Sequence, residues 1–271
     1  MTTRPDEPNR RSMPLVLSPE QHPWRFALFV MLALEVILLL CLGAARLFLP
    51  NVPLLALDLP ILLLNALFAA VLLTRLGWWR ASGFRRPERP RSLVLLALPV
   101  ALLIAPALLV GIDVPPFGKA LVLLVLTLLI GFQEEAIFRG VILKGLAPLG
   151  TLHAVLGSAL LFGVIHANSL LVGRDPAFVA VQIIASILGG VGFAALRLRL
   201  GSIWPLIALH ALNDFIQFSA SQGLAVEHAS PVLLTAKLGI SSVMALYGLF
   251  LLRDPGVRRW PARAEGAAAQ R

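Results

Sequence analysis

The sequence predicts an all-α membrane protein, a bundle of about eight transmembrane helices with both termini in the cytoplasm. Of its 271 residues 58% are hydrophobic and only 14% are charged, and the mean hydropathy is +0.87. The apolar residues lie in long uninterrupted runs, without the period of two or 3.6 that marks half-buried elements of soluble proteins. These observations exclude a water-soluble globule.

Eight runs are long enough to cross a bilayer, since about 20 apolar residues in a helix span roughly 30 Å of hydrocarbon. In chain order they are Phe26–Leu49, Val52–Leu73, Ser92–Gly111, Lys119–Leu146, Thr151–Ala167, Ala177–Leu196, Ser202–Ala220 and Val232–Leu252. The first run follows basic residues as a signal peptide does, but it is too long and has no clear small-residue cleavage site. We therefore expect a retained anchor, a transmembrane domain over 26–252, and cytoplasmic tails over 1–25 and 253–271.

The distribution of basic residues sets the predicted orientation. With the N-terminus inside, 18 of the 23 Lys and Arg residues fall on cytoplasmic segments, as the positive-inside rule requires. The densest group, 85–91, is interpreted as a topological anchor attracted to anionic lipid. The net charge of +9 does not indicate nucleic-acid binding, because the basic residues form none of the patterns of nucleic-acid-binding domains.

The single cysteine, Cys41, lies in an apolar run and excludes an intrachain disulfide and a cysteine-rich metal site. Arginine is abundant among Ala, Leu and Gly, a usage common in GC-rich bacterial genomes. The expected location is a bacterial plasma membrane.

Three of the predicted spans carry ionisable residues, each of which costs about 2.5–3.5 kcal/mol at the centre of a membrane helix. The fourth span contains Glu134, Glu135 and Arg139. The fifth contains Phe162 and His166, and the seventh contains His210, Asn213 and Asp214. The sequence therefore predicts one buried polar site built from three helices.

Helical spacing separates the two acids. Glu135 and Arg139 are four residues apart with the acid first, the favourable order for an ion pair on one face. Glu134 lies about 100° around the helix and is left available to something else, for which imidazole is the expected partner. His210 shares a face with both Asn213 and Asp214.

Several chemistries use such a set. A carboxylate with a histidine can take a proton from water, and a second histidine oriented by a carboxylate can stabilise an oxyanion, which together give hydrolysis. Alternatively, Glu134, His166 and His210 are a possible zinc set, although the H-E-x-x-H spacing is absent. The same residues also suit a cation or proton path or a structural network of interhelical hydrogen bonds.

The order Glu-Glu-x-x-x-Arg, Phe-x-x-x-His and His-x-x-x-(Asn/Asp) on successive membrane helices resembles the CPBP family of intramembrane proteases, also called the Abi or type II CAAX prenyl protease family. The resemblance covers Glu134 to Asp214. It implies an eight-helix membrane peptidase in which Glu134 and His166 activate water and His210 and Asp214 hold the oxyanion, with Glu135, Arg139, Phe162 and Asn213 in support.

The resemblance leaves other questions open. Eukaryotic members carry asparagine at the last motif position, where this chain has Asp214 preceded by Asn213. The family has been described both with and without a catalytic metal, so the cofactor stays unknown, and zinc is possible. The implied partners are the lipid bilayer and a membrane-associated or lipidated substrate; a non-catalytic immunity or assembly factor is the alternative. Flat membrane boundaries put Glu134 and His166 at different depths, which requires tilted or extended helices.

Overall fold

The computed structural model describes residues 18–49, 51, 58–110, 115–220, 231–258 and 260. The described residues form helices and connecting turns, which confirms the all-α prediction. The helices are α1 (Pro23–Phe48), α2 (Asp58–Leu76), η3 (Pro90–Leu96), α3 (Ala97–Val110), α4 (Phe117–Glu134), η4 (Glu135–Ile142), α5 (Leu143–Gly145), η5 (Ala147–Leu149), α6 (Thr151–Val164), η6 (Ile165–Val172), α7 (Pro176–Leu200), α8 (Trp204–Ala220), α9 (Pro231–Leu251) and α10 (Pro255–Arg258).

Six helical stretches within the described ranges are long and apolar enough to cross a membrane. They are Pro23–Phe48, Leu59–Leu76, Phe117–Gly145, Thr151–Val172, Pro176–Leu200 and Pro231–Leu251. The other two predicted spans are shorter apolar helices. The third begins as the 3₁₀-helix η3 before α3, and the seventh is the 17-residue α8. The structure thus supports an integral membrane protein, and the count of eight stays a prediction.

The stretch Phe117–Gly145 is the longest of the six. Its 29 residues extend about 43 Å at 1.5 Å per residue, well beyond a hydrocarbon thickness of roughly 30 Å. Such a helix must tilt or reach past the interface. The depth estimate for Glu134 assumed a helix that begins and ends at flat membrane surfaces, and this assumption does not hold for a helix of this length.

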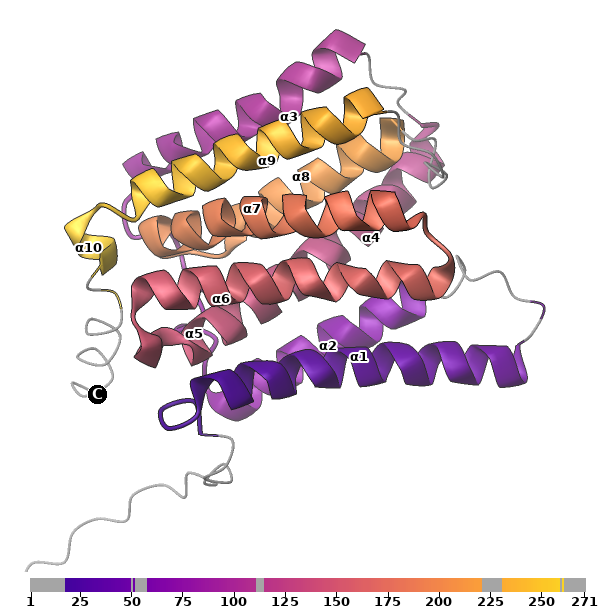
Figure 1. Ribbon diagram of the computed structural model, residues 1–271, viewed down its shortest axis with the longest axis horizontal. Coiled ribbons are helices and arrows are strands. Elements are labelled where there is room, and N and C mark those ends of the chain that lie inside the picture. Colours follow the sequence, from indigo (N-terminus) through magenta and orange to yellow (C-terminus); the bar gives the residue numbers. More distant parts are fainter. Residues whose placement is uncertain are drawn as a thin grey trace, which may run out of the picture.

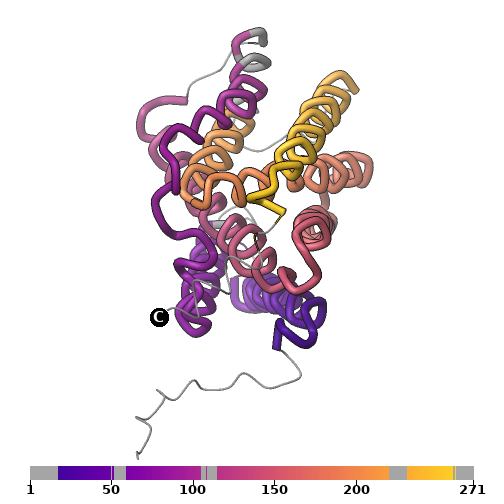
Figure 2. The backbone as a smooth tube through the Cα atoms, turned by 90° about the vertical axis from the view of Figure 1, so that its left-hand side faces the viewer, coloured from indigo at the N-terminus to yellow at the C-terminus, as the bar shows by residue number. Residues whose placement is uncertain are grey.

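The helices run back and forth across the bundle (Figure 1). In two perpendicular views α1 and α2 lie on one side of the bundle, α3 and α9 lie on the opposite side, and α4, α6, α7 and α8 lie between them (Figures 1 and 2). The start of α1 and the short α10 lie at the same end of the bundle. This is the arrangement that a topology with both termini on one side requires, while assignment of that end to the cytoplasm remains a prediction.

Small residues let the central helices approach closely. A Cβ added at Gly190 of α7 would lie 3.1 Å from the Cα of Ala159 on α6. Such close approach through small residues is typical of membrane helix packing. Ser186, Gly190 and Ala194 recur every fourth residue of α7, and Gly190 serves as the packing position that this spacing predicts.

The end of the bundle at which α10 lies is held by charged side chains. Arg197 of α7 is buried and donates from Nε to the carbonyl of Ser82 and from Nη2 to the carbonyl of Ala81, at 3.0 and 2.9 Å. In the predicted anchor segment, Arg85 pairs with Glu88 and donates to the carbonyl of Gly201, directly after α7. The segment is therefore also a structural connection between α2 and α7.

The chain after α9 folds back onto the bundle as far as the structure describes it, although the sequence analysis assigned it to a tail. Asp254 forms an ion pair with Arg199 of α7, and Thr151 of α6 donates to the carbonyl of Arg258. Desolvation raises the pKa of Asp254, but hydrogen bonding from the Gly256 N–H and attraction to Arg199 outweigh it and hold this pKa below its ordinary value. Residues 1–17 and 261–271 of the predicted tails lie outside the described residues.

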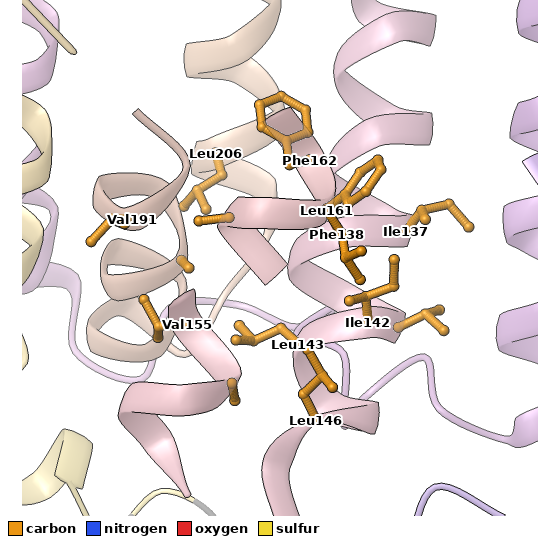
Figure 3. Close-up of a cluster of buried hydrophobic side chains, with 14 of the residues drawn as sticks. Ile137, Phe138, Ile142, Leu143, Leu146, Val155, Leu161, Phe162, Val191 and Leu206 are labelled. Carbon is orange, nitrogen blue, oxygen red and sulfur yellow. The ribbon is translucent and has the colours of Figure 1, made fainter. Parts of the chain in front are cut away.

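A hydrophobic core lies beside the predicted site. Figure 3 shows side chains of this core that come from η4, α6, α7 and α8, with Phe138 and Phe162 close together. The rings of Phe138 and Phe162 have centroids 5.1 Å apart in an edge-to-face arrangement. This packing fixes the register between the helix of the first motif and the helix of the second.

Candidate active site

The first motif coincides with a change of helix type. α4 ends at Glu134, and the next eight residues, Glu135–Ile142, form a π-helix in which every residue is buried. Ser158 of α6 donates to the carbonyl of Phe138 at 2.6 Å within this segment. A π-helix has i→i+5 hydrogen bonds and is frequently found at functional sites. Glu134 is therefore the last residue of the α-helix, and the buried Glu135 is the first residue of the wider π-helix.

Glu135 and Arg139 form the predicted ion pair. Glu135 Oε1 lies 3.1 Å from Arg139 Nη1, and both side chains are fully buried. The guanidinium carbon lies 3.8 Å from the centroid of the Phe162 ring, a cation–π distance. The two charges thus neutralise each other inside the bundle, as the four-residue spacing predicts.

His210 is brought to this pair by a close approach of α8 to α4. A Cβ added at Gly131 of α4 would lie 2.8 Å from the carbonyl oxygen of Ile207 and 3.5 Å from the Cβ of His210. Because residue 131 is a glycine, the His210 imidazole can lie beside Glu134 and Glu135. The sequence analysis did not single out Gly131, although it lies one helical turn before Glu135.

Three carboxylates surround the His210 ring. Nδ1 lies 2.8 Å from Glu135 Oε1, a buried hydrogen bond. Nε2 faces Glu134 Oε2 at 3.4 Å and Asp214 Oδ2 at 3.5 Å. A carboxylate oxygen accepts hydrogen bonds, so a protonated His210 can donate from both of its nitrogens in this position.

Glu134 is the acid left outside the Arg139 ion pair, as the sequence analysis predicted. Its side chain is 23% exposed, whereas that of Glu135 is completely buried. Its imidazole neighbour is His210 of α8. In the described structure no hydrogen bond or ion pair joins Glu134 to His166, the histidine that the family resemblance pairs with it.

His166 lies at the start of η6, immediately after α6. Its Nδ1 lies 2.7 Å from the carbonyl oxygen of Phe162, and its ring packs edge-to-face on the Phe162 ring, with centroids 5.0 Å apart. Because a carbonyl only accepts, Nδ1 carries the hydrogen. In the neutral ring Nε2 is then the unprotonated nitrogen.

Asp214 is the residue of the last motif that reaches His210. Its Oδ2 faces the imidazole, and its Oδ1 accepts a hydrogen bond from Asn213 Nδ2 at 3.0 Å. The His-x-x-x-(Asn/Asp) spacing thus puts the aspartate, one turn after His210, against the ring. Asn213 contacts the carboxylate rather than the imidazole.

The possible zinc set was tested against these positions. Among the residues described, no group of three or more His, Cys, Asp or Glu side chains is arranged to hold a metal ion. Glu134 and His210 are close to each other, whereas His166 is hydrogen-bonded to the Phe162 carbonyl and forms no ion pair with Glu134 among the described residues. The three residues therefore do not fit a catalytic zinc site with three protein ligands.

Two contacts of the site were not predicted from the sequence. The first is the hydrogen bond that Glu135 accepts from His210. The second is Phe193 of α7, whose ring lies 5.9 Å from that of His210 and 5.5 Å from the guanidinium carbon of Arg139. A phenylalanine in an apolar span carries no signal that distinguishes it from packing residues.

The chain was compared with known proteins. Residues 116–216 match the model of a family described as type II CAAX prenyl endopeptidase Rce1-like. No curated protein and no solved structure matches the chain. The matched segment contains all three motifs and runs from the residue before α4 into α8. The match confirms the resemblance of this chain to the CPBP or CAAX-protease-like family. At the level of the family, it supports the interpretation that the protein is a membrane protease and hence a hydrolase.

Proposed function

We propose that this protein is an intramembrane endopeptidase that hydrolyses a peptide bond within or beside the bilayer without a metal. The observation that supports it best is the contact of His210 with Glu134 at 3.4 Å beside an internally neutralised Glu135–Arg139 pair. An acid that a structural network needs is expected to be fully paired and dry. Glu134 is partly exposed and outside the ion pair, so it remains free to act on water.

In the proposed first step, Glu134 and His166 activate a water molecule. His166 donates from Nδ1 to Phe162, which leaves the lone pair of Nε2 for a proton or for the water itself. A water bound between Glu134 and His166 would have an acceptor on either side. Its oxygen attacks the carbonyl carbon of the scissile bond while its proton passes to Glu134 or His166.

In the proposed second step, His210 stabilises the oxyanion that forms on the carbonyl oxygen. Its Nε2 faces Glu134 at 3.4 Å and Asp214 at 3.5 Å, and an oxyanion at hydrogen-bond distance would accept the shorter bond from Nε2. Asp214 and Glu135 keep the ring oriented from its two sides. Collapse of the intermediate breaks the C–N bond, and the leaving amine takes the proton that the water gave up.

We further propose that the chain crosses a bacterial plasma membrane eight times with both termini in the cytoplasm, as a domain over 26–252 with tails over 1–25 and 253–271. The short α3 and α8 supply the two crossings beyond the six long helices. The substrate is then a membrane-associated or lipidated polypeptide that reaches the site from the bilayer.

The test compares membranes from cells that make the wild-type protein, Glu134→Gln or Glu35→Gln. Glu35 is a membrane-embedded acid of α1 outside the site, so its change to Gln is a matched control. Incubation in ¹⁸O-labelled water followed by mass spectrometry finds peptides whose new carboxyl terminus carries the label. We expect such a peptide with wild-type protein and with Glu35→Gln, and its loss with Glu134→Gln.

Other outcomes point to the rival functions. If no labelled peptide depends on Glu134, the proposed peptidase is wrong. Cation or proton flux in proteoliposomes that Glu134→Gln abolishes would then assign the residues to a transport path. Full cellular function of both Glu134→Gln and His166→Ala would instead indicate a non-catalytic membrane partner.

A further inference from the structure

Arg139 is buried without the hydrogen bonds that a guanidinium usually makes. Its side chain is fully buried, yet Nε, Nη1 and Nη2 make no hydrogen bond. Within the described residues its ion-pair partner is one oxygen of Glu135, at 3.1 Å from Nη1. A guanidinium has five N–H donors and is costly to bury unless its charge is compensated. Something besides Glu135 must hold it in place.

Aromatic rings surround the guanidinium where hydrogen-bond acceptors are missing. Its central carbon lies 3.8 Å from the centroid of Phe162 on α6 and 5.5 Å from the centroid of Phe193 on α7. Both distances are within the range of about 6 Å in which a cation is attracted to an aromatic ring. α7 also makes room for the group, since a Cβ at Gly190 would lie only 3.3 Å from Arg139 Nη2.

The Phe193 ring also contacts the other cationic partner of Glu135. Its centroid lies 5.9 Å from that of His210, with the two planes at 73°. Glu135 Oε1 is shared between His210 Nδ1 at 2.8 Å and Arg139 Nη1 at 3.1 Å, while its Oε2 is buried without a hydrogen bond. One oxygen therefore contacts both side chains, and the Phe193 ring approaches both from α7. The Phe162 ring of α6 approaches the same two groups, at 3.8 Å from the guanidinium carbon and 6.1 Å from the His210 centroid.

We propose that Phe193 is a positioning residue of the active site, because its ring holds the Arg139 guanidinium and the His210 imidazole at the shared oxygen of Glu135. Phe193 lies outside the three motifs, on a helix to which none of the predicted site residues belongs. If the ring is lost, the guanidinium keeps its contacts with Glu135 and Phe162 but loses its support on the α7 side. We expect Arg139 to shift towards the space left by the ring, Glu135 to follow it, and His210 Nε2 to turn away from Glu134. The consequence for catalysis rests on the proposed peptidase function, whereas the placement of His210 does not.

The variants are chosen to separate ring chemistry from volume. Phe193→Leu removes the aromatic ring and keeps an apolar side chain, and Phe193→Tyr keeps the ring. Phe29→Leu is the matched control, because Phe29 lies on α1 and is half exposed on the outside of the bundle. If Phe193→Leu does not fold, Phe193→Met supplies a flexible apolar side chain that also lacks a ring.

The first measurement needs no substrate. Protein labelled with ¹⁵N at histidine is studied by NMR in detergent micelles, and His210→Gln identifies the His210 ring signals. We expect Phe193→Leu to shift both ring nitrogens of His210, and Phe193→Tyr and Phe29→Leu to leave them near their wild-type positions. Unchanged His210 signals in Phe193→Leu overturn the proposal, whether or not the protein proves to be a peptidase.

The second measurement uses the peptide that the ¹⁸O experiment identifies as dependent on Glu134. We expect turnover to fall about tenfold in Phe193→Leu, the equivalent of one cation–π contact, with KM changed little, and to recover in Phe193→Tyr. An equal loss of turnover in Phe193→Leu and Phe193→Tyr would show that the position requires only the original shape, and would also overturn the proposal.

Discussion

Glu135→Gln is expected to destabilise the bundle strongly, whereas the same change at the neighbouring Glu134 should leave it folded. The neutral amide can still hydrogen-bond, but it cannot neutralise Arg139, which is buried with Glu135 as its ion-pair partner in the described structure. The change also removes the charge from the acceptor of the 2.8 Å bond with His210. At Glu134 the pair that is lost is the longer one with His210, at 3.4 Å, and part of the Glu134 side chain is accessible.

The magnitude follows from this geometry. Removing one partner of a buried ion pair costs about 3–5 kcal/mol, because the other charge is left uncompensated. This is a large part of the 5–15 kcal/mol that typically separates folded from unfolded protein. The contact of Glu134 with His210 is longer, at 3.4 Å, and leaves no buried guanidinium unpaired when it is lost, so its loss is expected to cost less than the loss of the Glu135 charge.

The assay is reversible unfolding in mixed micelles of increasing SDS fraction, followed by the fluorescence of the five tryptophans. The double variant Glu135→Gln with Arg139→Met should recover part of the lost free energy of unfolding, because it leaves no unpaired charge. The reasoning is refuted if Glu135→Gln unfolds within about 1 kcal/mol of the wild type, or if Glu134→Gln loses as much as Glu135→Gln.

Two further perturbations test the framework of the site and the fold. Gly131→Val should push α8 away from α4 and abolish turnover in the peptide assay, because even a Cβ at this position would lie 2.8 Å from the carbonyl oxygen of Ile207. Gly118→Val is the control: Gly118 lies on α4 with open space around it, so turnover should stay near the wild-type value. The pKa of Asp254 is lower in the folded protein than the ordinary carboxyl pKa of about 3.9. Its ion pair with Arg199 therefore stabilises α10 fully at pH values above about 3.9, and this stabilisation is lost as the pH falls through the lowered pKa of the folded protein. Amide exchange over residues 254–258 should therefore be faster in Asp254→Asn than in wild type at pH 7, and this difference should vanish in strong acid.

Much of the fold could be predicted from hydropathy alone, because an uninterrupted apolar run allows few structures in a bilayer. Six of the eight predicted spans are helices long enough to cross it. The chain after Arg253 was harder, since the ion pair of Asp254 with Arg199 joins residues far apart in sequence. Hydropathy carries no information about such a contact, and the assignment of 253–271 to a cytoplasmic tail stays a proposal.

The site was predictable where partners lie one helical turn apart. The pairs Glu135 with Arg139 and His210 with Asp214 follow from a spacing of four residues. Contacts between helices do not follow from spacing. The spacing predicted only an imidazole partner for Glu134, and the family resemblance named His166; in the structure His210 lies 3.4 Å from Glu134, and the joint role of Glu134 and His166 stays a proposal. The π-helix over Glu135–Ile142 could not be predicted either, because the sequence patterns were interpreted with 3.6 residues per turn.

The meeting of α4 with α8 has a consequence for the order in which the protein is made. A ribosome delivers Glu134, Glu135 and Arg139 to the insertion machinery well before His210. The Glu135–Arg139 pair is encoded within one helix and can neutralise itself on entry. Glu134 must wait for α8, so a nascent chain should stay inert towards other membrane polypeptides until α8 has been made.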